Sequence, residues 1–285
     1  MSVTANVNQQ KRRETTKKVL ITGLLAFGLI IFLAPVVLIL INSFKNEAEF
    51  YARGALSMPL HPSFDILRQA WERVDFTTKF INSLIISISV AILGLAISVC
   101  NAFAIGIGRI KWEKAFLIFF IFAMTVPQEA LAYPLYYFMK SLGLYDTKLS
   151  VILILSVLQA AYGTYLLSTV FRTFPISLIE AAKLDGCNKL QILQIVLAIN
   201  IPALSVLLVF FFIWTWNEFF LPLIFLISNS NQTIPIAVTL FQGQYTGEAT
   251  MQSACALLGI LPCVIFFVIF QRTLTRGVVS GGVKG

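Results

Sequence analysis

Long apolar runs alternate with short polar segments along most of the chain. Six of these runs reach the length of about 20 residues that a helix needs to cross a bilayer. Only two charged residues, Glu129 and Glu218, fall inside them. The pattern therefore predicts six transmembrane helices, at residues 19–41, 83–107, 115–138, 149–171, 203–227 and 254–270.

Composition supports a membrane protein. Hydrophobic residues make up 58% of the 285 residues and charged residues only 12%, about half the charged share of a soluble domain. The net charge of +8 is explained by cytoplasmic loops rich in Lys and Arg, without a nucleic-acid partner. The first apolar run is too long for the core of a cleavable signal peptide.

The distribution of basic residues predicts the orientation. Of the 21 Lys and Arg residues, fourteen lie in the N-terminal segment, the loops after the second and fourth spans, and the C-terminal tail. The other seven lie in the remaining loops, so both termini are expected in the cytoplasm. We expect a cytoplasmic segment at 1–18, a six-helix all-α domain at 19–271 with a cytoplasmic loop at 172–202, and a cytoplasmic tail at 272–285.

Local signals add two details. Ser63 is expected to cap an amphipathic helix along residues 64–74, lying on the membrane surface or contacting a partner. Pro127 and Pro134 are expected to interrupt the third span, because proline removes a backbone donor from the helix ladder.

Residues suited to covalent chemistry are sparse. His61 is the single histidine, and the four cysteines (Cys100, Cys187, Cys255 and Cys263) show no metal-ligand spacing. We find no phosphate-binding loop, no nucleophile elbow and no paired acid and base. The chain is therefore expected to bind no cofactor or metal and to catalyse no reaction itself.

The 172–202 loop interrupts the apolar pattern with a short polar helix. Ser177 and Glu180 have capping-box spacing, and Gly186 can end the helix in a left-handed conformation. A second amphipathic run covers residues 190–199 and leads to Pro202. Ala181 and Ala182 would let another surface approach closely, although a local capping motif without a partner would explain the same pattern.

Several motifs together resemble one family. Glu180-Ala181-Ala182 followed by Asp185-Gly186 resembles the EAA loop of ABC importer permeases, whose short helix docks on the ATPase subunit. Further similarities are Asn82-Ser83, Pro134-Leu135-Tyr136, LGLYDT (142–147), TWNEFFLPLIFL (215–226) and GGVKG (281–285). These segments resemble the second permease subunit of carbohydrate importers of the maltose and glycerol-phosphate type. Leu197-Ala198 departs from the Leu-Pro pair that this family often has.

The resemblance implies a type I ABC importer permease fold and a set of partners. It implies a second permease subunit, two copies of an ATPase that uses ATP and Mg, and an external solute-binding protein, in a prokaryotic cytoplasmic membrane. Residues implied in ATPase coupling are Glu180, Ala181, Ala182, Asp185 and Gly186. The tail residues Gly281, Gly282, Val283, Lys284 and Gly285 would contact the ATPase dimer, although a frayed end is the plain alternative.

The two intramembrane glutamates indicate a polar path. Glu218 and Glu129 lie about 22 and 21 Å along their spans at 1.5 Å per residue, and a charge facing lipid costs roughly 2.5–3.5 kcal/mol. We expect Glu218, Asn217 and Trp214 to line a sugar path, with Glu129 nearby, although internal bracing would also explain Glu129. In the last external loop, Gln242, Gln244 and Tyr245 either touch a ligand or partner or simply connect two helices.

Other classes fit less well. A secondary transporter would need no ATPase loop, and a membrane-embedded enzyme would need a nucleophile or metal set. An ABC permease for amino acids or phosphate would share the EAA loop but not, by resemblance, the TWNEFFLPLIFL and GGVKG segments. The expected function is the permease subunit of an ATP-driven importer for a di- or oligosaccharide, with another small polar solute such as glycerol-phosphate as the alternative.

Overall fold

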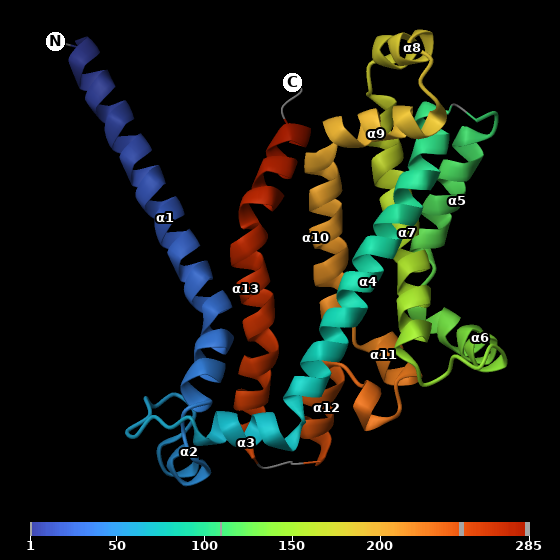
Figure 1. Cartoon of the computed structure of the whole chain (residues 1–285). Helices are drawn as coiled ribbons and strands as arrows, with labels where there is room; N and C mark the ends of the chain where they lie inside the picture. The colour runs from blue at the N-terminus through green and yellow to red at the C-terminus, as the bar shows by residue number, and fades with distance from the viewer. Residues whose placement is uncertain (1, 109, 245–247, 283–285) are drawn as a thin grey trace. The chain divides into compact units, whose positions relative to one another are not determined.

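All secondary structure in the described part of the chain is helical (Figure 1). The computed structural model describes residues 2–108, 110–244 and 248–282, and the side chains of 15–108, 110–239 and 248–271. Two compact units form. One combines the residues up to Trp71 with Gln244–Leu258, and the other combines Glu72–Gly243 with the residues from Gly259 onward.

The helices follow one another with short connections. In chain order they are α1 (Ser2–Asn42), α2 (Glu47–Arg53), α3 (Asp65–Arg73), α4 (Phe76–Ala102), the π-helix η1 (Phe103–Ile107), α5 (Glu113–Thr125), α6 (Gln128–Ser141), α7 (Lys148–Arg172), α8 (Ile176–Leu184), α9 (Lys189–Ile199), α10 (Ile201–Asn217), α11 (Phe220–Phe225), the 3-10 helix η2 (Asn229–Asn231), α12 (Ile234–Gln244) and α13 (Ala249–Gly282).

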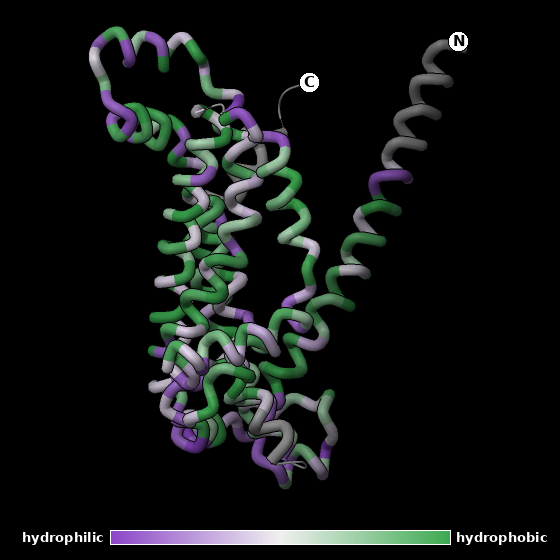
Figure 2. The backbone as a smooth tube through the Cα atoms, turned by 90° about the vertical axis from the view of Figure 1, so that its right-hand side faces the viewer, coloured by the Kyte–Doolittle hydropathy of each residue, from purple (hydrophilic) through white to green (hydrophobic). Residues whose placement is uncertain are grey.

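Four described helical segments are long and apolar enough to cross a membrane. They are Thr15–Asn42, Phe76–Ile107, Lys148–Arg172 and Ala249–Gln271, and they contain the first, second, fourth and sixth predicted spans. The hydrophobic colour follows the long helices, whereas hydrophilic residues gather in the connections (Figure 2). The segment after 271, expected as a tail, is helical as far as Gly282 because α13 continues through it.

The third predicted span is not one straight helix. The α5 and α6 axes differ by 94°. Val126 is extended, with φ −70° and ψ 120°, as expected for a residue that precedes a proline, and Pro127 precedes the first residue of α6. Pro134, by contrast, lies inside α6 without ending it, so the expected interruption occurs at Pro127 alone.

The fifth predicted span is shorter than expected. Helix α10 ends at Asn217, and a separate short helix, α11, follows after Glu218 and Phe219. Pro222 explains the break, because in a continuous helix its ring would clash with the carbonyl of Glu218, four residues earlier. At its other end, α10 makes an angle of 80° with α9.

The core of the larger unit lies between α4, α7 and α10, with α5 against α7. Close approach of α4 and α7 depends on small residues, as is usual between membrane helices. A Cβ on Gly163 of α7 would overlap Ser98 of α4 and lie 2.8 Å from Phe211 of α10. A group of fully buried apolar side chains from α4, α7 and α11 completes the core: Ile86, Val90, Leu155, Leu221 and Phe225.

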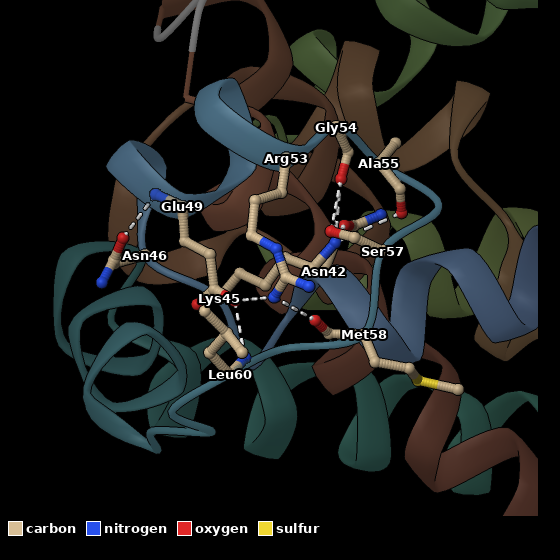
Figure 3. Close-up of polar contacts among 10 residues, drawn as sticks. All are labelled: Asn42, Lys45, Asn46, Glu49, Arg53, Gly54, Ala55, Ser57, Met58 and Leu60. Atoms are coloured by element: carbon tan, nitrogen blue, oxygen red, sulfur yellow. Dashed lines mark hydrogen bonds and ion pairs between the residues drawn. The ribbon is translucent and has the colours of Figure 1, made fainter.

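The smaller unit contains a buried lysine that organises the chain after α1 (Figure 3). The Lys45 ammonium donates to Asn42 Oδ1 at 2.9 Å and to the Gly54 carbonyl at 3.1 Å. Its side chain is fully buried, and this desolvation lowers the pKa of Lys45 below its usual value. Glu49 accepts a hydrogen bond from the Leu60 amide at 2.6 Å, which holds the segment after α2.

The predicted amphipathic helix after Ser63 is present as α3. Its first residue is Asp65. Ser63 Oγ accepts from the Asp65 amide at 3.0 Å and donates to Asp65 Oδ2 at 2.6 Å. Ser63 therefore fixes the start of the helix through the Asp65 side chain and amide.

Candidate functional site

The short helix predicted in the 172–202 loop is α8, but it starts differently from the prediction. Pro175 is its N-cap residue, in an extended conformation, and no side chain caps the helix. Ile176 is therefore the first helical residue and Ser177 the second. A hydroxyl inside the first turn cannot act as an N-cap acceptor, so the capping box expected from Ser177 and Glu180 is wrong.

The end of α8 is confirmed at the glycine that the sequence singled out. Gly186 has φ +79°, the left-handed conformation that glycine adopts without steric cost. The Cys187 amide donates to the Ala182 carbonyl at 2.9 Å, and the Gly186 amide donates to the Lys183 carbonyl at 3.1 Å. This pair of bonds is a Schellman motif, which satisfies carbonyls left free at the helix end.

A capping box does occur in this loop, one helix later. Asn188 Oδ1 accepts from the Gln191 amide at 3.0 Å, and Gln191 Oε1 accepts from the Asn188 amide at 2.7 Å. Helix α9 therefore starts at Lys189, directly after the Schellman turn. The sequence analysis missed this box because it searched for Ser or Thr followed by Glu, whereas Asn and Gln form the same pair of bonds.

Side chains of α8 divide into an anchored face and an exposed face. Ala182 is buried, and Phe174 just before the helix is only 7% exposed. Glu180, Ala181 and Asp185 are exposed, and Leu184 is 88% exposed. The exposed face of α8 therefore combines one leucine with small and charged side chains.

The root of this loop is held by an ion pair. Arg172, the last residue of α7, contacts Glu113, the first residue of α5, with 2.9 Å between Nη2 and Oε1. Both side chains are about one-third exposed. The pair joins the last residue of α7 to the first residue of α5, and these two helices pack against each other. The loop that contains α8 therefore begins at a residue whose position is held by this ion pair.

Trp214, Asn217 and Glu218 come together at one hollow. They line it with Phe210, Ile213 and Phe267, and its volume is about 600 Å³. Trp216, by contrast, is 3% exposed and packs against Phe80, Phe212 and Phe266. Of the two tryptophans on α10, only Trp214 is therefore presented to a ligand.

Glu218 lies at the break between α10 and α11. Its Oε1 accepts from the Phe220 amide at 3.1 Å and the Leu221 amide at 3.3 Å, so this carboxylate also caps α11. Glu129 is exposed in the first turn of α6. The two glutamates therefore lie at the two helix breaks.

Asn217 is held by its neighbours in the same hollow. Its Nδ2 donates to the Ile213 carbonyl at 2.8 Å, and its Oδ1 accepts from Cys263 Sγ of α13 at 3.7 Å. The side chain is exposed, so a ligand in the hollow could reach it.

A group of polar side chains to which the sequence analysis assigned no role holds residues 227–234. We call Lys79, Asn82, Ser83, Asp146 and Lys148 the loop clamp. Lys79 donates to the Asn229 carbonyl at 2.8 Å and also to Asn229 Oδ1. Asn82 donates to the Ser230 carbonyl at 2.7 Å and the Gln232 carbonyl at 2.9 Å. Ser83 Oγ accepts from the Ile234 amide at 3.0 Å.

Asp146 holds the same loop from the turn before α7. Its Oδ1 accepts from the Ile227 amide at 2.9 Å and the Ser228 amide at 3.0 Å, and its Oδ2 accepts from Ser228 Oγ. These bonds lower the pKa of Asp146, with the Ser228 hydroxyl as the largest cause. The signals in the sequence were Asn82-Ser83 and the LGLYDT segment, which carried the family resemblance but no predicted role.

Lys148 joins the two halves of the loop clamp. Its Nζ donates to Asn82 Oδ1 at 2.7 Å. Lys148 is the first residue of α7 and Arg172 the last, so the loop clamp and the 172–202 loop lie at opposite ends of this helix. At 1.5 Å per residue, its 25 residues separate them by about 37 Å.

The structure does not describe some of the predicted site residues or their side chains. The side chains of Gln242 and Gln244 are not among those described, and Tyr245 lies outside the described residues. Val283, Lys284 and Gly285 also lie outside them, whereas Gly281 and Gly282 are the last residues of α13.

The long apolar helices define a membrane protein. The family model of the inner membrane component of binding-protein-dependent transport systems matches residues 101–280. That range covers more than half of the chain, so the protein belongs to this family, and it is the permease subunit of an ABC importer.

Known relatives support this membership over most of their length. The chain is 30% identical to the sulfoquinovosyl glycerol transport system permease protein SmoH of Agrobacterium fabrum, over 89% of each chain. It is 28% identical to the melibiose/raffinose/stachyose import permease protein MelC of Bacillus subtilis, over 88% of this chain and 91% of MelC. The fold matches a chain in the crystal structure of a bacterial ABC transporter involved in alginate import, with a TM-score of 0.77 at 21% identity, covering 92% of this chain and 97% of that one.

Proposed function

We propose that this permease forms half of the translocation path of an ATP-driven carbohydrate importer. It would pair with a second permease subunit, bind an ATPase dimer in the cytoplasm and receive substrate from an external solute-binding protein. The chain would cross a prokaryotic cytoplasmic membrane six times, with the bent pair α5 and α6 as the third crossing, α10 as the fifth, and both termini in the cytoplasm.

The observation that carries this proposal is α8. A nine-residue helix presents the 88% exposed Leu184 next to Ala181 and Glu180, while its root is tied to α5 by the Arg172–Glu113 pair. A helix docked on an ATPase through this face would pass movement of the ATPase to α7 and α10. We assign ATPase coupling to Glu180, Ala181, Ala182, Asp185 and Gly186, and a second contact to residues 281–285.

The hollow beside α10 favours a hydroxyl-rich substrate. Trp214 offers an apolar ring face, and Asn217 and Glu218 offer polar groups that can bond hydroxyls. The alternative substrate class, a phosphate ester such as glycerol-phosphate, fits less well. The described lining of the hollow contains the carboxylate of Glu218 and no Lys or Arg, so a dianion would be repelled.

Deletion and co-purification test the proposal. Cells lacking this chain should lose uptake of at least one carbohydrate and regain it when the chain is restored. Detergent extracts containing a tagged chain should yield an ATPase subunit, and Glu180→Ala should reduce the amount retained. Because Glu180 makes no cap bond to α8, its effect would come from the docking surface. Normal uptake of every tested carbohydrate by the deletion strain would contradict the carbohydrate proposal.

A further inference from the structure

A second cavity lined by Trp214 contains a buried amide that no part of the proposed path has used. The cavity has a volume of about 110 Å³. Residues from α5, from the break after it, from the start of α6, from α7 and from α10 line it: Ala123, Met124, Val126, Gln128, Leu155, Leu158, Gln159, Tyr162 and Trp214. Trp214 also lines the hollow that contains Asn217 and Glu218, so the two spaces share one indole.

One face of α7 forms the main wall of this cavity. Leu155, Leu158, Gln159 and Tyr162 follow the spacing of three and four residues that places side chains on one helix face. Three of these positions carry apolar or aromatic side chains. Gln159 is the exception, and it is 3% exposed.

The hydrogen bonding of Gln159 is incomplete. Its Nε2 donates to Thr215 Oγ1 at 2.9 Å, whereas its Oε1 has no partner among the described residues. If the amide were turned over, the oxygen would meet Thr215 and the nitrogen would be left without a partner. Either way, a buried amide in the middle of α7 lacks one bond, and such a group is destabilising unless a ligand or water completes it.

The aromatic rings around the amide fit the same kind of ligand. Tyr162, Phe210 and Trp214 form a cluster, with ring centroids 5.4 Å apart for Tyr162 and Phe210 and 5.5 Å for Phe210 and Trp214. Gln128 faces the cavity from the break where α5 and α6 diverge by 94°. Apolar walls with a few polar groups are typical of small-molecule sites, and a hydroxyl can satisfy the amide in either orientation because it both donates and accepts.

We propose that Gln159, together with Gln128, Tyr162 and Trp214, forms a carbohydrate hydroxyl site in the membrane part of this subunit. The site rests on the proposed carbohydrate function and deepens it. Trp214 lines both this site and the Glu218 hollow, so a sugar at either one meets the same indole. Gln159 binds a sugar hydroxyl, and Thr215 positions the Gln159 amide.

Transport kinetics test the role of Gln159. The probe is a carbohydrate whose uptake is lost when the chain is deleted, so failure at that first step contradicts the proposed function and not the site. Gln159→Met keeps the side-chain length and removes both polar groups. We expect it to raise the KM for uptake about tenfold, as for the loss of one hydrogen bond to a buried polar group. Ser168→Ala is the matched control, because Ser168 is another buried α7 side chain whose hydroxyl has no partner among the described residues, and it does not line the cavity. It should change the KM less than twofold.

Thiol labelling gives a second and direct measurement. In a chain whose Cys100, Cys187, Cys255 and Cys263 are replaced, Gln159→Cys or Gln128→Cys should react with a small water-soluble methanethiosulfonate, and the transported carbohydrate should slow the reaction severalfold. Gln128→Cys decides the result if the Gln159 variants do not reach the membrane. An unchanged KM in Gln159→Met, or labelling that the carbohydrate does not slow, would overturn the proposal and leave the cavity to water.

Discussion

The loops at the two ends of α7 are built in opposite ways. In residues 172–202, helix α8 is closed by bonds within the loop, and Leu184 and Ala181 are exposed. In residues 227–234, side chains from α4 and from the turn before α7 bond the loop directly, through the loop clamp. Both loops connect membrane helices, so their position in the chain does not explain the difference.

The contrast indicates two different tasks. A loop whose own turns are rigid but whose surface is uncovered can transmit force from a partner that binds it. A loop held by buried polar groups keeps its place, because losing one bond would leave a buried group unpaired. Under the proposed topology, the first loop meets the ATPase and the second is a fixed part of the external face.

The largest expected effect comes from a change in backbone strain at the exposed loop. Gly186→Val places a β-branched residue at φ +79°, where such a side chain is strongly disfavoured. The Schellman turn should shift, and retention of the ATPase in a pull-down should fall more than tenfold. Gly143→Val is the matched control, because Gly143 has φ +69° and lies at the other end of α7. Gly143→Val should leave ATPase retention within twofold of that of the unsubstituted chain. Equal losses in both variants would refute the contrast between the two loops.

The next effect concerns the clamped loop. Lys79 is 1% exposed, and Lys79→Met removes its bonds to Asn229. Hydrogen bonds to charged groups contribute about 1.5–3 kcal/mol, so hydrogen-exchange protection of residues 229–234 should fall at least tenfold. Lys140→Met serves as the control, because Lys140 is an exposed α6 residue outside the loop clamp. Unchanged protection in Lys79→Met would show that the loop does not depend on the clamp.

A smaller effect is expected at the exposed leucine. Leu184→Asp should leave the stability of the chain within about 0.5 kcal/mol, as for most surface substitutions, and lower the ATPase affinity about fivefold, within the range for truncating an interface side chain. Leu142→Asp is the control, because Leu142 is 53% exposed and precedes the Asp146 turn. Normal ATPase binding by Leu184→Asp would remove Leu184 from the docking surface.

The smallest effect is a pH dependence confined to the clamped loop. The folded-state pKa of Asp146 lies below 3.8, so its ionised form stabilises the loop fully above that pH. The contribution of ionised Asp146 to the stability of the loop should disappear as the pH falls from about 3.8 through the folded-state pKa of Asp146. Hydrogen exchange at residues 227–231 should therefore accelerate in that acid range, beyond the intrinsic change of the rate with pH. In Asp146→Asn this extra acceleration should be absent, and its persistence there would assign it to another group.

The sequence predicted the long helices well because each depends on a local property. Uncharged runs long enough to cross a bilayer lie in α1, α4, α7 and α13. Gly186 ends α8 as predicted, because that prediction depended only on the backbone conformation of Gly186 itself. The sequence also selected Trp214, Asn217 and Glu218 together, because an intramembrane carboxylate lies within four residues of an indole and an amide that suit a sugar.

Only the tertiary structure decided how the broken helices and polar groups meet. The sequence analysis predicted a fifth span that continues past Glu218, although Pro222, four residues later, prevents a continuous helix there. Lys79, Asn82, Asp146 and Lys148 come from segments up to 69 positions apart, and their common loop lies some 80 to 150 positions further along. Gln159 resembles any other polar residue in an apolar run until α5, α7 and α10 enclose it. Periodicity describes one helix at a time, whereas a clamp or a cavity exists only between helices, so packing had to determine both.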